Sequence, residues 1–343
     1  MKAIRINRFG GPEVLEIADL PAPRPAADEL LVAVEAAALN HLDIWVRRGL
    51  PGSTPPLVMG SDGAGRIAAL GGDVQGFAVG DRVVIQPGTF CGGCKYCRSG
   101  RENLCQQYGI LGESENGVQA QLVALRQHNV FPLAEHLTYE EGASFGLVFL
   151  TAFQMLVKRA QLQQGETVLV VGGSSGVGAA AIQIAAHMGA RVIATASPGK
   201  KTEFAKTMGA EAVVDHYSTD WYRQVLDFTG AKKVDVVFEH VGAATWEQAL
   251  RTLAVGGRLV FCGGTSGPQV EINLRHAFRK HLSFLGSTMG DLDTFRSVVN
   301  LFNQKAYRPF VDSVFTMDQI GDAHRYLEDS GHCGKVVIRI DQN

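Results

Sequence analysis

Residues 167–190 read TVLVVGGSSGVGAAAIQIAAHMGA, an apolar run, a glycine-rich turn and a second apolar run. The first run predicts a buried strand over Val168–Val171, and the second predicts a helix over Val177–Met188. A strand that enters a helix through glycines is the setting of a dinucleotide-binding turn, because the backbone can approach a pyrophosphate at the helix N-terminus. The three positions of a G-x-G-x-x-G turn are occupied by Gly173, Ser175 and Gly178, so the middle one is serine. A glycine-rich turn of some other α/β protein is the alternative interpretation.

The same stretch carries no charged residue and is long enough to raise the question of a membrane span. Its glycines, two serines and His187 interrupt the apolar sequence. We therefore interpret it as a buried strand, a turn and a buried helix.

Short apolar runs continue this pattern along the chain and alternate with helical stretches. The predicted strands are Val168–Val171, Arg191–Ala196, Ala212–Val214, Val234–Phe238, Arg258–Phe261 and Ser283–Leu285. Strands that are apolar throughout indicate a parallel sheet covered on both faces, and six of them make a Rossmann doubly wound sheet. Before them, Thr138 and Glu141 have the spacing of a capping box, which predicts a helix from there to about Lys158.

The N-terminal part is rich in β patterns and prolines. Its candidate strands are Ala3–Arg8, Leu30–Ala36, Ala64–Leu70 and Arg82–Ile85. The segment after about residue 290 is too short to form a domain, so we expect it to pack on this first part. The predicted division is a β-rich domain of residues 1–133 and 291–343, with a dinucleotide-binding domain of residues 134–290 inserted into it.

The 343 residues carry 32 Lys and Arg against 34 Asp and Glu, a net charge of −2. Without a basic block, this balance argues against a nucleic-acid partner and against electrostatic attachment to a membrane. The start of the chain shows no apolar targeting segment. We therefore expect a cytoplasmic protein with reduced thiols.

The end of the second predicted strand bears on the choice of cofactor. A site for NAD usually places a carboxylate there to bind the ribose 2′-hydroxyl. Here the strand is followed by Ser197, Lys200 and Lys201, and residues 179–202 contain no carboxylate. A hydroxyl and two ammonium groups would attract a 2′-phosphate, so NADP(H) is favoured over NAD(H). The alternative is a solvated basic turn.

Four of the six cysteines, Cys91, Cys94, Cys97 and Cys105, lie within fifteen residues. This spacing predicts one closed, structural zinc site per chain, because four thiolates leave the metal no open position. An iron–sulfur cluster or redox-active thiols are the alternatives. Cys262 and Cys333 are expected to be ordinary buried cysteines.

Together, the N-terminal β pattern, the four-cysteine lobe, the G-x-x-G-V-G turn and the closing Gly334-Lys335-Val336-Val337 resemble the medium-chain dehydrogenase/reductase superfamily over essentially the whole chain. The resemblance implies a GroES-like catalytic domain carrying the zinc lobe, beside the Rossmann domain. In the zinc alcohol dehydrogenases of this family, a second zinc is held by two cysteines and a histidine. The matching positions here are Asn40, Ser61 and Leu147, which are poor zinc ligands. A partial site of His41 and Asp62 stays open as an alternative.

The N-x-x-D context of Asn40 looks like the quinone oxidoreductase branch, and the intact cysteine lobe looks like the branch of the acryloyl-CoA reductases. The resemblance thus implies hydride transfer from NADPH to a carbonyl-activated C=C bond or a quinone, without catalytic zinc. The candidate catalytic residues are Asn40, His41, Asp43 and Trp45. Competing hypotheses are a zinc-type NAD(P)-dependent alcohol dehydrogenase and a non-catalytic NADPH-binding protein.

The resemblance also implies cofactor contacts. Thr151 is expected near the nicotinamide ribose, and His216 near the adenine. The pyrophosphate is expected at Gly173, Ser175, Gly176, Val177 and Gly178, and the 2′-phosphate at Ser197 and Lys201. The nicotinamide side is expected to be lined by His240, Val241, Cys262, Gly263 and Thr265, with Lys335 reaching the cofactor from the tail. His216 as a surface histidine and His240 as a hydrogen-bonded strand-end histidine are the alternatives.

The substrate is expected to be a small molecule, and Arg47 and Arg48 hint at a basic groove for a coenzyme A thioester. Members of the family usually dimerise by pairing the sixth strands of two cofactor domains. The resemblance therefore implies a homodimer through the apolar run 282–286, and a homotetramer is an equal alternative.

Overall fold

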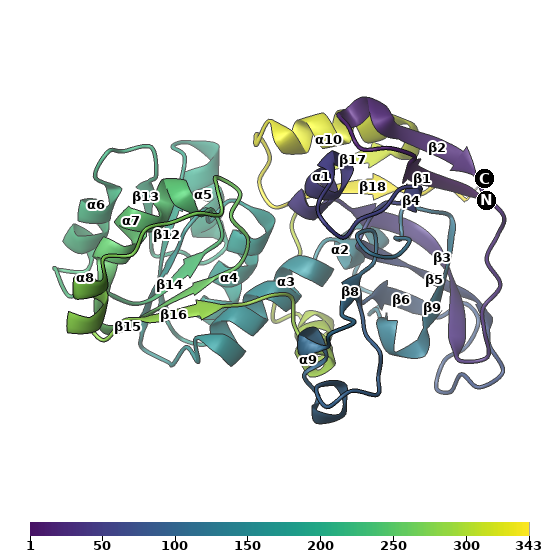
Figure 1. The fold of residues 1–343 in the computed structure, drawn as a ribbon, viewed down its shortest axis with the longest axis horizontal. Helices are drawn as coiled ribbons and strands as arrows, with labels where there is room; N and C mark the ends of the chain where they lie inside the picture. Colours follow the sequence, from purple (N-terminus) through teal and green to yellow (C-terminus); the bar gives the residue numbers. More distant parts are fainter. Residues whose placement is uncertain (343) are drawn as a thin grey trace. The chain divides into compact units, whose positions relative to one another are not determined.

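The stretch that opens the dinucleotide motif folds as its pattern predicts. In the computed structural model, which describes residues 1–342, strand β11 (Thr167–Val170) leads through a turn into helix α4 (Gly176–His187). The six strands expected around it form one sheet in the order β13-β12-β11-β14-β15-β16. Every neighbouring pair is parallel. This is the strand order of a Rossmann fold, and Figure 1 shows the sheet in the teal and green part of the chain.

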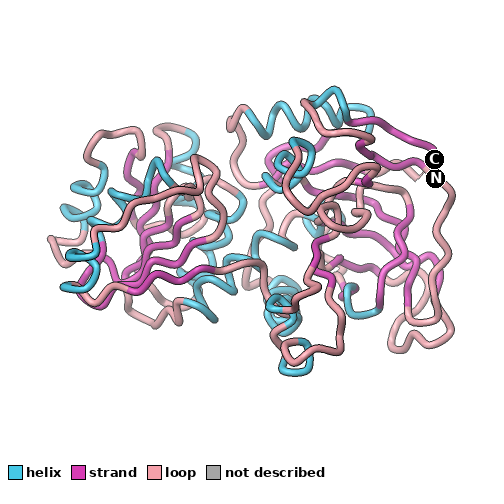
Figure 2. The backbone as a smooth tube through the Cα atoms, in the orientation of Figure 1, coloured by secondary structure: helices cyan, strands magenta, loops and turns pink. Residues whose placement is uncertain are grey.

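The remaining elements of this sheet and its helices follow in regular alternation. They are β12 (Arg191–Ala196), α5 (Lys200–Thr207), β13 (Ala212–Asp215), α6 (Trp221–Phe228), β14 (Val234–Glu239), α7 (Ala243–Thr252), β15 (Leu253–Phe261), α8 (Leu274–Arg279) and β16 (Ser283–Gly286). Buried aliphatic residues of the strands, such as Leu169 and Val237, pack with Trp221 and Trp246 of the helices. Figure 2 shows the strands side by side with helical segments around them.

The β-rich part contains a larger sheet with strand order β10-β6-β5-β3-β18-β17, and β9 also pairs with β3. A three-stranded sheet, β2-β1-β4, and a hairpin-like pair, β7 and β8, complete it. Its strands are β1 (Lys2–Ile6), β2 (Leu15–Asp19), β3 (Glu29–Ala38), β4 (Leu57–Val58), β5 (Asp62–Leu70), β6 (Arg82–Ile85), β7 (Gly88–Thr89), β8 (Gly109–Ile110), β9 (Leu122–Arg126), β10 (Val130–Pro132), β17 (Val311–Thr316) and β18 (Lys335–Arg339). Its α-helices are α1 (His41–Arg48), α2 (Tyr139–Ala143), α9 (Leu292–Asn303) and α10 (Ile320–Glu328), and α3 (Gly146–Phe153) begins in it.

The C-terminal tail becomes part of the β-rich sheet. Strand β18 pairs antiparallel with β3, placing Val337 opposite Ala38, and it pairs in parallel with β17. Val336 and Ile338 are fully buried in the same core as Ile4 and Val32. This arrangement matches the expectation that the tail packs on the N-terminal part.

The chain divides into two compact units, Met1–Leu147 with Gly290–Asn343, and Val148–Met289. We call them the β-rich unit and the cofactor unit. The first boundary comes later than the expected one after residue 133, because helix α2 packs on strands β3 and β5.

The single helix expected between Thr138 and Lys158 is wrong in one respect. The capping box is present, since Thr138 Oγ1 accepts from the Glu141 N–H at 3.1 Å and Glu141 accepts from the Thr138 N–H at 2.8 Å. The helix then breaks at Ser144 and restarts as α3 at Gly146, followed by a π-helical stretch over Gln154–Arg159. The break leaves the N–H of Leu147 outside the helical ladder, where it bonds to a carboxylate described below.

Within residues 1–342, no helix has the length and apolar character needed to cross a bilayer.

Candidate active site, cofactor site and metal centre

Asn40 is the residue at which the β-rich sheet passes into helix α1. It follows strand β3 with extended backbone angles, and its N–H donates to Asp43 Oδ2 at 2.7 Å. Asp43 is the third residue of the helix, and its carboxylate accepts from the N–H of the residue just before the helix, as in a capping box. The backbone of Asn40 is held independently of its side chain.

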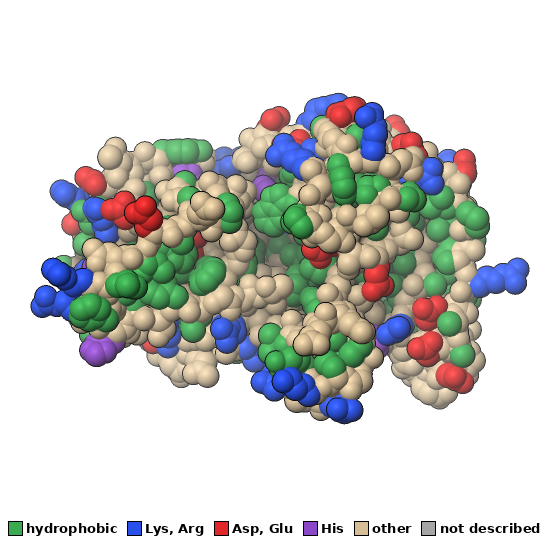
Figure 3. Space-filling model, in the orientation of Figure 1, with side chains coloured by type: hydrophobic (Ala, Val, Ile, Leu, Met, Phe, Trp, Pro, Cys, Tyr) green, Lys and Arg blue, Asp and Glu red, His purple; other side chains and the backbone are tan. Residues whose placement is uncertain are grey.

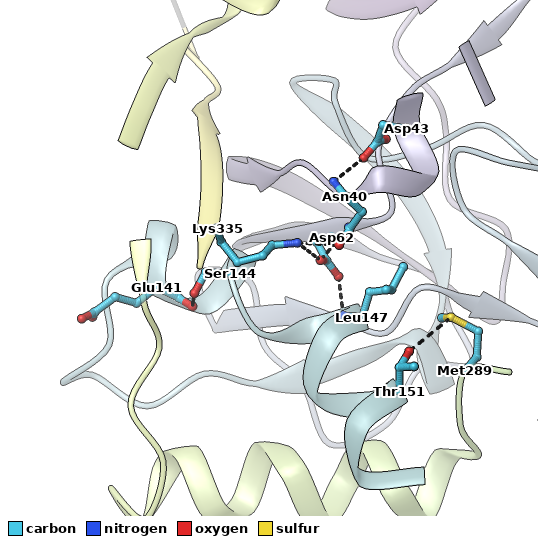
Figure 4. A network of polar contacts seen from close by, with 9 residues as sticks. All are labelled: Asn40, Asp43, Asp62, Glu141, Ser144, Leu147, Thr151, Met289 and Lys335. Carbon is cyan, nitrogen blue, oxygen red and sulfur yellow. Dashed lines mark hydrogen bonds and ion pairs between the residues drawn. The ribbon is translucent and has the colours of Figure 1, made fainter. Parts of the chain in front are cut away.

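The side chain of Asn40 joins a buried polar cluster, drawn in Figure 4. Its Nδ2 donates to Asp62 Oδ2 at 2.9 Å, while Lys335 Nζ donates to its Oδ1 at 2.6 Å. The ammonium also lies 3.1 Å from Asp62 Oδ2. Since an ammonium only donates and a carboxylate only accepts, these partners determine which way the amide points. One N–H of the amide remains after the bond to Asp62.

Asp62 is the first residue of β5, and its carboxylate is fully buried. Besides Asn40 and Lys335 at Oδ2, it accepts the N–H of Leu147 through Oδ1 at 2.6 Å. Both of its oxygens are therefore engaged by the protein. From the sequence, Asp62 is expected only in a partial metal site, because nothing in the local pattern indicates its burial.

The positions that hold a catalytic zinc in related enzymes do not fit a metal in this chain. The Asn40 oxygen already accepts from an ammonium, whose charge opposes a divalent cation at the same oxygen. Leu147 offers an alkyl group, and the Ser61 hydroxyl has no hydrogen-bond partner among the described residues. The alternative site of His41 and Asp62 gains no support, because the Asp62 oxygens are taken.

Asp43 lies deep in the same region. Burial, more than any other cause, raises the pKa of its carboxyl to about 7, with the Asp62 charge acting in the same direction. The Asn40 N–H and the Lys335 charge act against this rise. Its Oδ1 is buried and has no hydrogen-bond partner in the described part of the chain. The group therefore changes charge near neutral pH.

The other two predicted catalytic residues lie on the same helix. His41 and Trp45 are both half-buried and lie one helical turn apart, with their ring centroids separated by 6.4 Å. Further along α1, Arg47 is fully buried, and both Arg47 and Arg48 pair with Glu328 of α10, at 2.5 Å and 2.8 Å. The Arg47 side chain is thus enclosed by the protein, whereas the Arg48 side chain is 62% exposed.

The glycine turn shows why serine occupies the middle position of the motif. Ser175 caps helix α4: its Oγ accepts from the Gly178 N–H at 3.0 Å and donates to the Gly172 carbonyl at 2.9 Å. A Cβ on Gly178 would lie 2.2 Å from that carbonyl oxygen, and a Cβ on Gly173 would lie 2.8 Å from the Ala194 Cβ. Glycine is thus required at the two outer positions. The N-terminus of α4, with Gly176 and Val177 in its first turn, has the form of an anion site.

The carboxyl ends of β14 and β15 gather several of the residues expected at the nicotinamide side. His240 Nε2 lies 3.2 Å from Ser175 Oγ, and burial lowers the pKa of His240 to about 4, so the ring is neutral. Thr265 Oγ1 donates to the His240 carbonyl at 3.4 Å, and Gly263 has a φ of 72°. Cys262 is half-buried, unlike the buried cysteine that the sequence analysis predicts, and desolvation of its thiol raises the pKa to about 12.

Glu239 organises the loop that carries His240 and Val241. Its carboxylate accepts from the N–H groups of Val241 and Gly242 at 3.0 Å and 2.8 Å, and from the Thr245 hydroxyl at 2.8 Å. Burial, as the largest cause, raises the pKa of Glu239. No sequence signal singled out this residue, because a carboxylate at a strand end is common.

The residues expected near the adenosine end also come together. Ser197 follows β12, Lys201 lies in the first turn of α5, and His216 follows β13. The His216 N–H bonds to the Ala196 carbonyl at 3.4 Å. Burial lowers the pKa of His216, and the Lys201 charge lowers it further, so the two side chains are electrostatic neighbours. Thr151 lies apart from this group, buried, with its hydroxyl 3.9 Å from Met289 Sδ.

The four cysteines of the lobe fit a structural metal ion. Four ligands 2.3 Å from a tetrahedral zinc are about 3.8 Å apart. The four sulfurs lie within 4.8 Å of one another, with separations of 3.5 Å for Cys94 and Cys97, 3.9 Å for Cys91 and Cys97, and 3.6 Å for Cys105 and Cys91. In residues 1–342 they are the one group of three or more such side chains placed to hold a metal.

The protonation chemistry of this cluster depends on a cation. The backbone at Cys97 lowers the pKa of Cys94 to about 6, whereas burial raises the pKa of Cys97 to about 12. A bound divalent cation would deprotonate all four thiols. Cys333, outside the lobe, is fully buried as expected.

Comparison with known proteins agrees with a chain built from a β-rich unit and a Rossmann unit. Residues 26–135 match the alcohol dehydrogenase GroES-like domain, and residues 176–304 match the zinc-binding dehydrogenase family. The quinone oxidoreductase of Homo sapiens is 30% identical over 353 residues, which cover 98% of this chain and 97% of that protein. The chain belongs to the medium-chain dehydrogenase/reductase superfamily.

Other members of the superfamily are similar over the whole chain. The crystal structure of a protein named as an NAD-dependent alcohol dehydrogenase has a TM-score of 0.97 and 42% identity, covering 99% of this chain and all of that one. The crotonyl-CoA carboxylase/reductase of Cereibacter sphaeroides is 30% identical over 96% of this chain and 84% of its own. This medium-chain dehydrogenase/reductase is therefore an oxidoreductase with a GroES-like unit and a Rossmann unit, as expected from the motifs.

Proposed function

We propose that this medium-chain dehydrogenase/reductase is an NADPH-dependent enzyme that reduces a carbonyl-activated C=C bond or a quinone without a catalytic zinc. The observation that carries the proposal is the Asn40 amide. Its oxygen, at the position of a zinc ligand in related enzymes, accepts from Lys335, and one of its N–H groups is left to donate.

The chemistry needs a hydrogen-bond donor more than a metal. When bound, NADPH would supply the hydride for the β-carbon of the substrate, and the C=C electron pair would then move onto the carbonyl oxygen. The Asn40 N–H stabilises that oxyanion by a hydrogen bond that strengthens as charge develops. Water donates the proton to the α-carbon, and the carbonyl forms again. For a quinone, the same donor stabilises the hydroquinone anion until water protonates it.

In this proposal His41 and Trp45 lie beside the substrate, since their helix α1 begins directly after Asn40. Asp43 holds the Asn40 backbone and serves as a structural partner of the donor. The names of two relatives, a quinone oxidoreductase and a crotonyl-CoA carboxylase/reductase, support a substrate with a conjugated carbonyl.

NADP(H) is the proposed cofactor, held by the α4 turn and by Ser197 and Lys201. The absence of a carboxylate over residues 179–202 supports a 2′-phosphate at this place. His216 would lie beside the adenine, and the loop of His240, Val241, Cys262, Gly263 and Thr265 beside the nicotinamide. The lobe of four cysteines would hold one structural zinc.

A second candidate function is an alcohol dehydrogenase that uses NAD. It is favoured by the name of the 42% identical protein of known structure, an NAD-dependent alcohol dehydrogenase. This function requires a second zinc or another electrophile for the alkoxide, and the Asn40, Ser61 and Leu147 positions supply no zinc ligands.

The deciding experiment combines a metal count on the purified protein with a substrate panel. The panel contains enones, quinones and enoyl thioesters with NADPH and NADH, and alcohols with NADP⁺ and NAD⁺. We expect one zinc per chain and NADPH consumption with a conjugated carbonyl. Two zinc ions with alcohol oxidation would establish the second candidate, and NADPH binding without turnover would establish a non-catalytic protein.

The matched variant is Asn40→Ala, which keeps the backbone bond to Asp43. Loss of one oxyanion donor lowers kcat by about 10²–10³-fold. An unchanged kcat in this variant would contradict the assigned role of the amide.

We propose a homodimer or homotetramer that uses the free edge of β16. This strand ends the Rossmann sheet, and exposed apolar residues lie nearby on α8, with Leu274 73% and Phe278 67% exposed. Figure 3 shows green side chains gathered over this part of the surface. Sedimentation of wild type and Phe278→Asp tests it, and a monomeric wild type would refute it.

A further inference from the structure

The buried ammonium of Lys335 contacts two side chains of the β-rich unit. The resemblance assigns this lysine to the cofactor. In the structure, Lys335 begins β18 and is only 4% exposed, and its two hydrogen-bond contacts, to Asn40 and Asp62, are within the β-rich unit.

Burial makes these contacts strong. A buried ammonium is costly unless it is paired, and Asp62, fully buried, supplies the opposite charge at 3.1 Å. Asp62 is itself held by the Leu147 N–H and by the Asn40 amide, so it cannot turn toward another partner without losing both. The position of Lys335 Nζ is thus determined from two sides.

The ammonium acts on the Asn40 amide in two ways. First, it prevents rotation of the amide, because a flipped amide would direct its N–H group at a cation that cannot accept a hydrogen bond. Second, the positive charge of the Lys335 ammonium, which is bonded to the amide oxygen, draws electron density away from the amide nitrogen. The remaining N–H of Asn40 therefore becomes a better hydrogen-bond donor. Asp62, accepting from the other N–H, completes the orientation.

We infer that Lys335 is a positioning residue that orients and polarises the Asn40 amide, in place of contacting the cofactor. The inference rests on the proposed role of Asn40 as the oxyanion donor. In this inference Lys335 supplies a positive charge next to Asn40 and acts on the substrate oxygen through the Asn40 amide, without binding that oxygen itself.

The test uses the full-length protein with the Lys335→Met substitution, which keeps the length of the side chain without its charge. We expect kcat to fall by about 10–100-fold, while the Kd of NADPH, measured by fluorescence without substrate, stays within twofold of wild type. The kinetic isotope effect with 4-deuterated NADPH should increase, because the hydride step becomes slower. A structural disturbance alone would not slow this step selectively.

A second variant guards against misfolding. Lys335→Met leaves the Asp62 charge buried and unpaired, so we add Asp62→Asn, which keeps an oxygen for the Leu147 N–H. The double variant should melt near the wild-type temperature and still show the low kcat. The conservative Lys335→Arg should recover part of the lost rate. As a matched control, Arg339→Met removes an exposed cation at the other end of β18, paired with Glu140, and should leave the kinetics unchanged.

Two outcomes would overturn the inference. A Kd for NADPH raised tenfold or more with kcat preserved at saturation would make Lys335 a cofactor contact. A folded double variant with wild-type kcat would show that the charge does not act on catalysis. Both differ from failure of the proposed function, in which the wild-type protein itself reduces no conjugated carbonyl or quinone.

Discussion

The buried carboxyl of Asp43 predicts an unusual dependence of stability on pH. Its pKa in the folded protein is about 7, against an ordinary value of 3.8. Between these values the folded state binds the proton more tightly than the unfolded state, so stability is greatest at low pH and falls as the pH rises toward 7. The substitution Asp43→Asn removes this titration and keeps an oxygen that accepts the Asn40 N–H.

The magnitude follows from the difference of about 3 pKa units. At about 1.4 kcal/mol per unit, ionisation costs the wild-type protein ~4 kcal/mol at pH 8 and less than half of that at pH 5. Asp43→Asn should therefore gain ~2–3 kcal/mol relative to wild type between pH 5 and pH 8. For a folded unit of the size of the β-rich unit, which contains Asp43, this free energy corresponds to a difference of ~5–10 °C in Tm.

The assay is differential scanning calorimetry of both proteins at pH 5 and pH 8. Other titrating groups are common to both proteins and cancel when the two differences in Tm are compared. Exposed Asp73 supplies the control, since Asp73→Asn should follow the wild type at both pH values. Equal pH dependence in wild type and Asp43→Asn would refute the reasoning.

Three further predictions concern the metal and the cofactor. Cys105→Ser should release zinc, measured by atomic emission, and lower the Tm of the β-rich unit; a variant that retains a full equivalent of zinc would contradict the four-ligand site. Gly178→Ala places a Cβ 2.2 Å from the Gly172 carbonyl, so the Kd of NADPH measured by fluorescence should rise at least tenfold with zinc content unchanged, whereas an unaltered Kd would place the phosphate elsewhere. Lys201→Ala should raise the Kd of NADPH about tenfold or more and that of NADH less than twofold, and equal effects on both would argue against a 2′-phosphate contact.

Much of the cofactor unit could be predicted from local sequence. Strand β12 has the predicted bounds, Arg191–Ala196, and all of its residues after Arg191 are buried, because a strand covered on both faces needs a nearly uninterrupted run of residues that can be buried. The glycine turn could also be predicted from the sequence. Close contacts at Gly173 and Gly178 exclude any side chain, so the turn requires glycines that can be seen in the sequence. The cysteine lobe was predictable for the same reason: its ligands lie within one short loop.

The break in the helix after Thr138 could not be predicted from the same kind of pattern. Residues 139–158 are apolar enough for one continuous helix. The helix ends at Ser144 and restarts at Gly146, where the N–H of Leu147 bonds to Asp62, a residue 85 positions earlier in the chain. At the break, the free N–H of the restarted helix is thus bonded to a buried carboxylate from a distant part of the chain.

The sequence by itself determined the family, the doubly wound α/β class and the residues of the zinc lobe, because each is visible in local sequence patterns. Only the tertiary structure decided the chemistry around Asn40. The partners of its side chain, Asp62 and Lys335, are brought to it by the sheet pairing of β3 with β5 and β18. No local sequence pattern predicts that Lys335, at the start of a C-terminal strand, contacts Asn40. Its partners depend on burial and on the pairing of strands that are far apart in the sequence.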